Sequence, residues 1–368
     1  MEEFLHSPLL ILAMMVLYLG LMSMYKPAYT RSGIIKTGKN KAGVILLFVF
    51  CLFSVQDTDY FHYMDCLNIL KYGGKTQLED IYADIAEFVD YSNLWFRTIV
   101  WGSALSIFLL SVKHLRIKMD LVLFFFITIF ITKFSYARVS LAMAMGMCGY
   151  ALLVKPLNNK VLSFAMGITV IACSLMFHKS AIFWIAVFCC SVIKLNKQRM
   201  IILLVLYPLC AYLFQKYALQ YFMKSAEEAL VEKAMGYLEE EEGMHGLSYY
   251  INIILTRIPY YLLLFSIIKS ILTNRYAVLA NYEKRIVNVA FYVICFSSLF
   301  LFDTEANTNV MYYRLLYYSI LPLSLLTAIF HKHGFYPRLT KMSVIIGCCS
   351  IIYFFLYSFY TSVLLSRS

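Results

Sequence analysis

Residues 134 to 145 read Phe-Ser-Tyr-Ala-Arg-Val-Ser-Leu-Ala-Met-Ala-Met and place Arg138 at the start of a long apolar run. A charged residue costs roughly 2.5 to 3.5 kcal/mol at the centre of a membrane helix, so an arginine near one is usually paired, reaches the interface or binds an anion. The stretch therefore predicts a membrane helix with Arg138 at its mouth and a negatively charged partner beside it.

The composition of the whole chain excludes a water-soluble globular protein. Of 368 residues, 61% are hydrophobic and only 14% are charged, with a mean hydropathy of +0.72. This is typical of an integral membrane protein with many spans. The N-terminus, Met-Glu-Glu, lacks a basic region before its first apolar run, so we expect a retained first helix. The ten cysteines show no CxxC spacing, and we expect no metal site and no cofactor.

Twelve apolar segments are long enough to be considered as spans of about 20 residues. They lie near 5 to 25, 42 to 55, 94 to 112, 120 to 133, 136 to 154, 161 to 177, 179 to 193, 200 to 222, 249 to 272, 286 to 302, 310 to 330 and 342 to 363. We therefore expect an all-α polytopic bundle, one transmembrane domain over residues 1 to 368. The second, fourth and seventh segments are short enough to be tilted or re-entrant.

Charge orients these segments, because cytoplasmic loops carry an excess of Lys and Arg. Six loops hold 19 of the 32 basic residues: 26 to 41, 113 to 119, 155 to 160, 194 to 199, 273 to 285 and 331 to 341. Of the 21 acidic residues, only Asp120 and Glu283 lie in or beside them. If all twelve segments cross, these loops share the cytoplasmic side and both termini face outward. Their net positive charge suits anionic membrane lipids, and we expect no nucleic-acid partner.

Two of the outward loops are large, 56 to 93 and 223 to 248. In the first, Tyr60, Tyr63, Leu67 and Leu70 have helical spacing and predict an interfacial helix. Gly73-Gly74 then predicts a break, and an acidic helical stretch follows over 77 to 88. In the second, the run from Glu239 to Glu242 is typical of a solvated surface that follows a short helix.

Basic side chains also stand at the outward ends of several predicted helices, where the positive-inside bias disfavours them. They are Arg97, Lys133, Arg138, His178, Lys179, Arg257 and Arg314. A single such residue can reach the interface with its long side chain. Several converging on one side repel one another, so we expect an anion to offset them. A lipid-linked pyrophosphate fits, because guanidinium groups pair bidentately with phosphate oxygens.

Four short motifs carry a resemblance to a known family. They are Asp57-Thr58-Asp59-Tyr60-Phe61-His62-Tyr63, Arg138 to Ala142, Phe177-His178-Lys179-Ser180-Ala181, and Tyr313-Arg314 to Tyr318. In order, side and spacing they resemble the EpsG family, which is related in character to the Wzy-type polymerases of bacterial O-antigen, capsule and exopolysaccharide. The resemblance implies a Wzy-like (GT-C-like) bundle in the bacterial cytoplasmic (inner) membrane. It also implies transfer of a growing glycan from polyprenyl (undecaprenyl) pyrophosphate onto the next lipid-linked repeat unit.

The resemblance also implies roles for individual residues. Charge on the departing pyrophosphate is to be taken up by Arg138, with Arg257 and Arg314 beside it. The base near the attacking hydroxyl is Asp59 or His178. For Asp59 a helix cap remains an alternative, as does a plain interfacial role for His178. Further substrate-binding residues are expected on the same outward side: Asp57, Tyr60, Tyr63, Arg97 and Lys179. The partners implied are the lipid-linked oligosaccharide, membrane lipid and a chain-length regulator protein.

Three other functions fit parts of the same pattern. A membrane glycosyltransferase that takes single sugars from a polyprenyl monophosphate would suit Asp57 and Asp59 equally well. An O-antigen ligase would move finished glycan to another acceptor. A lipid-linked oligosaccharide flippase or transporter is less consistent with the sequence, because transporters tend to have repeated halves with charges at the midplane, and no repeat is visible here.

Overall fold

The computed structural model describes the backbone of residues 8–25, 28–29, 35–36, 41–53, 58–76, 78–131, 137–219, 247–299 and 315–365. The first elements are α2 (Pro8–Tyr25), β1 (Ala28–Tyr29), β2 (Ile35–Lys36), α3 (Lys41–Phe53), α4 (Thr58–Lys71), α5 (Asp80–Phe88), α6 (Asn93–Leu115), α7 (Met119–Phe125), η1 (Phe126–Phe130) and α8 (Ala137–Val154). Then follow α9 (Lys160–Phe177), η3 (Lys179–Ala181), α10 (Ile182–Ser191), α11 (Lys197–Leu213), η4 (Phe214–Leu219), α14 (Leu247–Leu272), η5 (Arg275–Val278), α15 (Asn281–Ser298), α17 (Ile320–Lys332) and α18 (Pro337–Leu365). Apart from the two-residue pair β1 and β2, every regular element in these ranges is helical.

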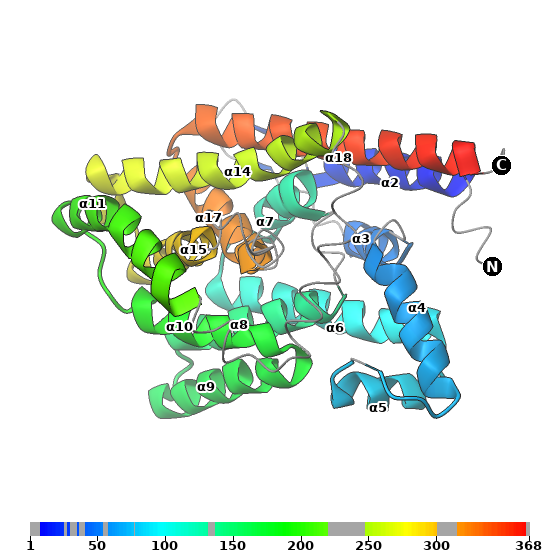
Figure 1. Cartoon of the computed structure of the whole chain (residues 1–368). Coiled ribbons are helices and arrows are strands. Elements are labelled where there is room, and N and C mark those ends of the chain that lie inside the picture. The colour runs from blue at the N-terminus through cyan, green and yellow to red at the C-terminus, as the bar shows by residue number, and fades with distance from the viewer. Residues whose placement is uncertain are drawn as a thin grey trace.

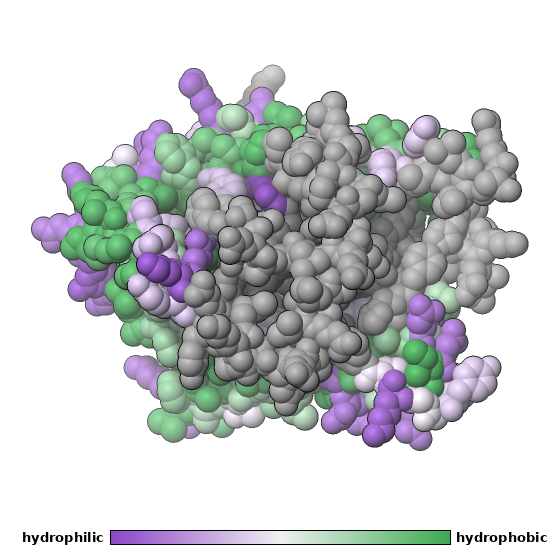
Figure 2. Space-filling view, in the orientation of Figure 1, coloured by the Kyte–Doolittle hydropathy of each residue, from purple (hydrophilic) through white to green (hydrophobic). Residues whose placement is uncertain are grey.

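Seven of the described helices are long and apolar enough to cross a membrane: Pro8–Tyr25, Asn93–Leu115, Lys160–Phe177, Lys197–Tyr217, Leu255–Leu272, Leu315–Lys332 and Pro337–Tyr360. Large apolar side chains remain exposed along the peripheral ones, including Leu9 (75%) on α2 and Val161 (79%) on α9. Figure 2 shows hydrophilic residues at the left edge and over α5 at the lower right, and hydrophobic surface over α11 at the left and over α9 at the bottom. The chain is a multi-pass membrane protein, and its apolar exterior is the surface that contacts lipid.

Helices coincide with all twelve apolar segments of the sequence. Beyond the seven long ones, shorter apolar helices cover Ala42–Leu52, Met119–Phe130, Val139–Val154 and Lys179–Ser191, and α15 covers the tenth segment. The second, fourth and seventh segments form α3, α7 with η1, and η3 with α10. At a rise of 1.5 Å per residue, a helix such as α3, with 13 residues, extends only about 20 Å, less than the hydrocarbon thickness of about 30 Å.

The centre of the bundle is α17, whose residues 320 to 330 are all buried. It lies beside α7 and α15, and Figure 1 shows these three between a layer of α2, α14 and α18 and a layer of α6, α8 and α9. Its polar groups are satisfied within the helix: Ser324 Oγ donates to the Ile320 carbonyl at 2.8 Å, and Thr327 Oγ1 to that of Leu323 at 2.7 Å. A helix enclosed on all sides can be buried all round, as this one is over residues 320 to 330.

The first and last long helices pack antiparallel. Met22 of α2 lies against Cys348 of α18, with the sulfur atoms 3.4 Å apart, and Tyr18 lies against Phe355 with ring centroids 6.2 Å apart. The beginning of α2 and the end of α18 therefore lie at the same end of the molecule, on the right in Figure 1. This is the arrangement that an even number of crossings produces.

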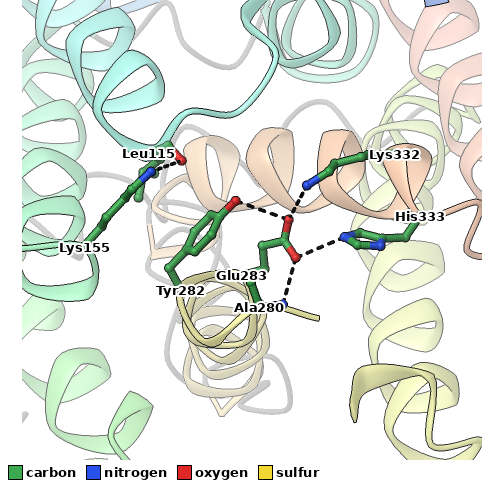
Figure 3. Close-up of polar contacts among 7 residues, drawn as sticks. All are labelled: Leu115, Lys155, Ala280, Tyr282, Glu283, Lys332 and His333. Atoms are coloured by element: carbon green, nitrogen blue, oxygen red, sulfur yellow. Dashed lines mark hydrogen bonds and ion pairs between the residues drawn. The ribbon is translucent and has the colours of Figure 1, made fainter. Parts of the chain in front are cut away.

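At the other end of the molecule, a buried carboxylate links the beginning of α15 to the end of α17. Glu283, 1% exposed, accepts hydrogen bonds from Lys332 Nζ at 2.9 Å and from the Ala280 N–H at 3.0 Å, and lies 3.0 Å from His333 Nε2. Tyr282 donates to it at 3.4 Å and carries Lys155 Nζ over its ring at 5.0 Å (Figure 3). Contacts separated by 49 and 50 residues thus tie the beginning of α15 to the end of α17.

The first large predicted outward loop, 56 to 93, contains the helices that its periodicity predicts. It contains α4, a turn at Gly73 with φ of 77°, and α5. Tyr63 and Leu67 are buried and Leu70 packs against the core, which confirms the apolar face. A positive φ is a conformation that glycine adopts without a steric penalty, so Gly73 permits the reversal between the helices. Most of the second outer loop, 223 to 246, lies outside the described residues, and with it the stretch from Glu239 to Glu242.

Candidate functional site

The beginnings of α6 and α8 and the end of α9, which are predicted to face outward, lie together. Helices α8 and α9 cross closely at two glycines: a Cβ on Gly149 would stand 2.5 Å from the Gly167 carbonyl oxygen. His114 Nε2 lies 2.6 Å from the Lys155 carbonyl oxygen, so α6 and α8 end at the same end of the molecule and run parallel. Since α9 runs back, its last residues lie beside the first residues of α6 and α8.

This packing gathers three of the predicted site residues at one end. Arg97 is the fifth residue of α6, Arg138 is the second residue of α8, and His178 directly follows α9. From the glycine crossing, the helix rise carries the chain about 17 Å to the level of Arg138 and about 17 Å to that of His178. The backbone of α8 begins at Ala137, one residue after the predicted start, and the side chain of Arg138 lies outside the described residues.

His178 is held in one orientation by its neighbour. It ends α9 with extended backbone angles, φ −163° and ψ 125°, and its Nδ1 accepts the N–H of Ser180 at 3.2 Å. Ser180 Oγ lies 2.6 Å from the same nitrogen and 2.9 Å from the hydroxyl of Tyr318. A nitrogen that accepts a backbone N–H carries no proton, so Ser180 Oγ donates to it and Tyr318 donates to Ser180.

The direction of these hydrogen bonds fixes what His178 can do. With Nδ1 accepting, the proton of the neutral ring lies on Nε2, which makes Nε2–H a donor. A second proton on Nδ1 would break the bond from the Ser180 backbone. The ring is therefore better suited to donating to an anionic oxygen than to removing a proton from a hydroxyl.

An aromatic row connects the surroundings of His178 with those of Arg97. Tyr82 of α5 lies between Phe177 and Phe96, with ring centroids 6.0 Å from each, and Phe96 lies 6.2 Å from Tyr63 of α4. The rings of Phe96, Tyr82 and Tyr63 are buried, at 0%, 0% and 3% exposure. Rings at this spacing attract one another beyond their buried area. The first outer loop is thus packed onto the ends of α6 and α9.

Arg97 is enclosed by protein, with an exposure of 6%. Its charge acts on the thiol of Cys51, near the end of α3, so the two side chains are close. A buried guanidinium keeps its charge and must be offset by polar or anionic groups. Lys179 is different, because its side chain is exposed.

Arg257 lies on α14, two residues before Pro259, which is inside the helix. The side chain is half-buried and its Nε atom is shielded from solvent. Because proline has no N–H, the carbonyl of residue 255 loses its usual helical donor beside the arginine. One turn on, Tyr260 is buried, with its ring 5.3 Å from that of Phe130.

Tyr260 of α14 also lies near Tyr317, the residue before Tyr318, whose hydroxyl contacts Ser180 beside His178. Its hydroxyl is close enough to Tyr317 for the two to interact electrostatically, and Tyr317 precedes Tyr318 in the chain. Tyr318 itself is fully buried, with Trp184 and Phe183 at 6.0 and 5.9 Å. Residues of α14, the start of α17 and the α9–η3 junction therefore form one continuous set of contacts.

The remaining predicted residues are placed only in part. Asp59 and Tyr60 belong to the first turn of α4, where an acidic residue interacts favourably with the helix dipole, and their side chains lie outside the described residues. Asp57, Arg314 and Lys133 lie wholly outside them. In the parts of the chain that the structure describes, no group of three or more His, Cys, Asp or Glu side chains is arranged to hold a metal ion.

Sequence reasoning missed Tyr82 and Tyr260 as neighbours of the site. The sequence predicts the 77 to 88 stretch as an acidic helix, and its charge pattern does not indicate what the apolar face of that helix covers. The spacing of Tyr82 and Ala86, both fully buried, was the available signal.

Comparisons with known proteins identify no relative: no family model, no curated protein and no solved structure matches this chain.

Proposed function

We propose that this protein is a membrane glycosyltransferase of the EpsG and Wzy type. It joins oligosaccharide repeat units carried on polyprenyl pyrophosphate at the outer face of the bacterial cytoplasmic membrane. The observation that carries the proposal is the common outer end of α6, α8 and α9, where Arg97 is buried and His178 presents a donor nitrogen. Cationic and donor groups in a protein-enclosed site are what a departing pyrophosphate requires.

In the proposed reaction the hydroxyl of the incoming unit attacks the anomeric carbon of the growing glycan. The bond from that carbon to the pyrophosphate oxygen breaks, and the electron pair leaves with the lipid pyrophosphate. Arg138, with Arg257 and Arg314, neutralises the leaving group, and the Nε2–H of His178 donates to one of its oxygens. Asp59 takes the proton of the attacking hydroxyl, because the orientation of His178 suits a donor better than a base.

Sugar binding is assigned to the aromatic surface of the first outer loop. Tyr60 of α4, with Asp57 before it, is the proposed contact for the repeat unit, and Tyr63, predicted to bind substrate, is buried and instead holds α4 against Phe96. Arg97 and Lys179 complete the cationic surroundings. Support comes from the packing of Tyr63 and Tyr82 onto Phe96, since it holds this loop against the helix ends that carry Arg97 and Arg138.

We further propose that all twelve helices cross the membrane and that both termini face outward. The antiparallel pair of α2 and α18 supports an even number of crossings. The 19 basic residues of six alternate loops support a cytoplasmic location for the opposite end. Helices as short as α3 are tolerated when neighbouring protein covers their ends. A chain-length regulator protein is the proposed partner in the membrane.

The test of the reaction is the glycan on the lipid carrier in cells that lack this protein. A polymerase defect leaves a complete single repeat unit at the outer face. Loss of a flippase leaves no unit outside, and loss of a glycosyltransferase that adds single sugars leaves an incomplete unit. Loss of a ligase leaves long glycan on the carrier. Any of these last three results would contradict the proposal.

A further inference from the structure

The cytoplasmic end of the bundle contains a cavity that the proposed reaction does not use. It has a volume of about 750 Å³ and lies between the end of α6 and the connection from α8 to α9. Its basic lining residues are Lys113, His114, Arg116 and Lys155, and none of the described residues that line it is acidic. A concave site with one sign of charge attracts ions of the opposite sign.

The walls of this cavity are fixed by hydrogen bonds. His114 Nε2 donates to the Lys155 carbonyl at 2.6 Å, and Lys155 Nζ donates back to the Leu115 carbonyl at 3.0 Å (Figure 3). On the α9 side, Ser163 Oγ accepts the N–H of Leu157 at 2.6 Å and Asn159 Oδ1 accepts that of Leu162 at 3.1 Å. A ligand would therefore meet a preformed site and would not have to order it.

Two cations remain available to a ligand. Lys113 and Arg116 are exposed, and their side chains make no hydrogen bond or ion pair with the residues that the structure describes. Arg116 has a left-handed backbone, φ 56° and ψ 36°, at the end of α6, where glycine is usually favoured. Burial, and then the charge of Arg116, lower the pKa of Lys155.

The rim of the cavity is apolar and faces outward from the bundle. Leu110 is 61% exposed and Leu162 is 52% exposed, and both line the cavity. Each belongs to a helix long and apolar enough to cross the membrane, α6 and α9. The cationic floor and the lipid-facing rim are therefore continuous, which a site for a small soluble anion would not need.

We propose that this cavity binds the phosphate headgroup of an anionic phospholipid of the cytoplasmic leaflet. Lys113 and Arg116 contact the phosphate, and the acyl chains lie along Leu110 and Leu162. Basic pockets between membrane helices on the cytoplasmic side are suited to such headgroups. Because α6 and α8 also carry Arg97 and Arg138 at their other ends, a lipid bound here would hold together the two helices of the proposed active site.

The test compares lipid binding by the purified full chain and two matched double variants. Lys113→Gln with Arg116→Gln removes the two available cations. Arg338→Gln with Lys341→Gln removes an exposed Arg and an exposed Lys at the start of α18, on the same side of the membrane and outside the cavity. Native mass spectrometry counts retained phosphatidylglycerol, and titration with short-chain phosphatidylglycerol gives the Kd, with phosphatidylcholine as the neutral lipid.

We expect the cavity variant to bind phosphatidylglycerol at least about tenfold more weakly, since two charge-assisted hydrogen bonds are lost. The α18 variant should bind phosphatidylglycerol with nearly the same Kd as the unsubstituted protein. The unsubstituted protein, the cavity variant and the α18 variant should have equal Tm. The double variant Leu110→Ser with Leu162→Ser should weaken the binding of phosphatidylglycerol, because the contacts with its acyl chains are reduced. It should leave the affinity for inorganic phosphate unchanged. Equal affinity for phosphatidylglycerol in all variants would overturn the proposal.

Two further probes separate the sources of the phosphate group. If inorganic phosphate or glycerol phosphate binds as tightly as phosphatidylglycerol, the cavity is a site for a soluble anion and the lipid is excluded. Competition with bound phosphatidylglycerol tests the lipid carrier. If a polyprenyl phosphate displaces it at a lower concentration than added phosphatidylglycerol does, the cavity is a site for the lipid carrier. The proposal predicts that the soluble phosphates and the polyprenyl phosphate all bind more weakly than phosphatidylglycerol, which the protein retains.

Discussion

Tyr318 and Ser180 are 138 residues apart in the chain, yet the tyrosine hydroxyl lies 2.9 Å from Ser180 Oγ. Ser180 Oγ in turn lies 2.6 Å from Nδ1 of His178. A buried residue just before the central helix α17 therefore sets the orientation of the histidine that follows α9. The contact favours a donor role for His178 over the role of base that the resemblance implies, because it determines which ring nitrogen carries the proton.

We predict that Tyr318→Phe lowers polymerisation by about 2- to 10-fold, since one neutral hydrogen bond is worth roughly 0.5 to 1.5 kcal/mol. Ser180→Ala should lower it as well, and the double variant should be no worse than Ser180→Ala alone, because Tyr318 acts through Ser180. Glycan chain length per unit of protein is the readout. Tyr72→Phe, at a tyrosine that is 86% exposed, is the control. Additive losses in the double variant would show that Tyr318 acts by another route.

We predict that Gly149→Ala disturbs the site from a distance of several turns. Its Cβ would stand 2.5 Å from the carbonyl oxygen of Gly167, and overpacking of this kind typically costs about 1 to 3 kcal/mol. The substitution should lower the Tm of the purified protein and shorten the glycan, since α8 and α9 carry Arg138 and His178. Gly20→Ala is the matched control, because a Cβ there meets nothing within 4 Å. Equal Tm for the two variants would contradict the observed packing of α8 on α9.

We predict a pH-dependent contribution to stability from Glu283. Burial alone would raise its pKa, but hydrogen bonds from Lys332 and the Ala280 N–H, with the charges of Lys332 and His333, lower the pKa below the usual value. A lowered pKa means that this stability is present above the pKa of the unfolded chain and is lost as the pH falls through the folded value. Glu283→Gln should therefore cost about 1.5 to 3 kcal/mol at pH 7 and much less at strongly acidic pH.

Thermal unfolding in detergent across that pH range measures the effect. Glu87→Gln is the control, since Glu87 is an exposed carboxylate on α5. A difference between Glu283→Gln and the unsubstituted protein that stays constant from pH 7 to acidic pH would show that the charge of Glu283 does not stabilise the fold.

We predict opposite accessibility for two exposed lysines. In a cysteine-free background, Lys75→Cys in the turn between α4 and α5 should react with an impermeant thiol reagent added to intact cells, as should Thr76→Cys. Lys197→Cys, at the start of α11, should react only after the membrane is opened. The reason is the segregation of acidic and basic loops. The reverse pattern would place the proposed site in the cytoplasm, where the growing glycan is absent.

Much of the helical framework could be predicted, because a membrane helix must be a continuous apolar run and such runs are visible in one dimension. The described part of α8, Ala137–Val154, lies within the predicted segment 136 to 154, and α4 and α5 flank the predicted glycine break. The pairing of these helices could not be predicted. Glu283 with Lys332, or Tyr82 between Phe96 and Phe177, depends on contacts between distant segments that no periodicity encodes.

The candidate site shows the same division. The side on which Arg97, Arg138 and His178 stand follows from the positions of the helix ends. The burial of Arg97 and the bond of Tyr318 to Ser180 do not, since both arise from the tertiary packing of the helices. Side chains therefore had to be placed before a donor role could be distinguished from that of a base.

The most direct test of the account is glycan chain length in cells that carry Arg138→Ala or Arg138→Lys, normalised to protein level. Losing one preorganised donor to a developing negative charge costs roughly 2.7 to 4 kcal/mol, so Arg138→Ala should lower polymerisation by at least ~100-fold with normal membrane insertion. Arg138→Lys should recover part of that loss, because it keeps the charge without the planar fork. Near-normal glycan from Arg138→Ala would contradict the account, since it would show that Arg138 takes no part in the reaction.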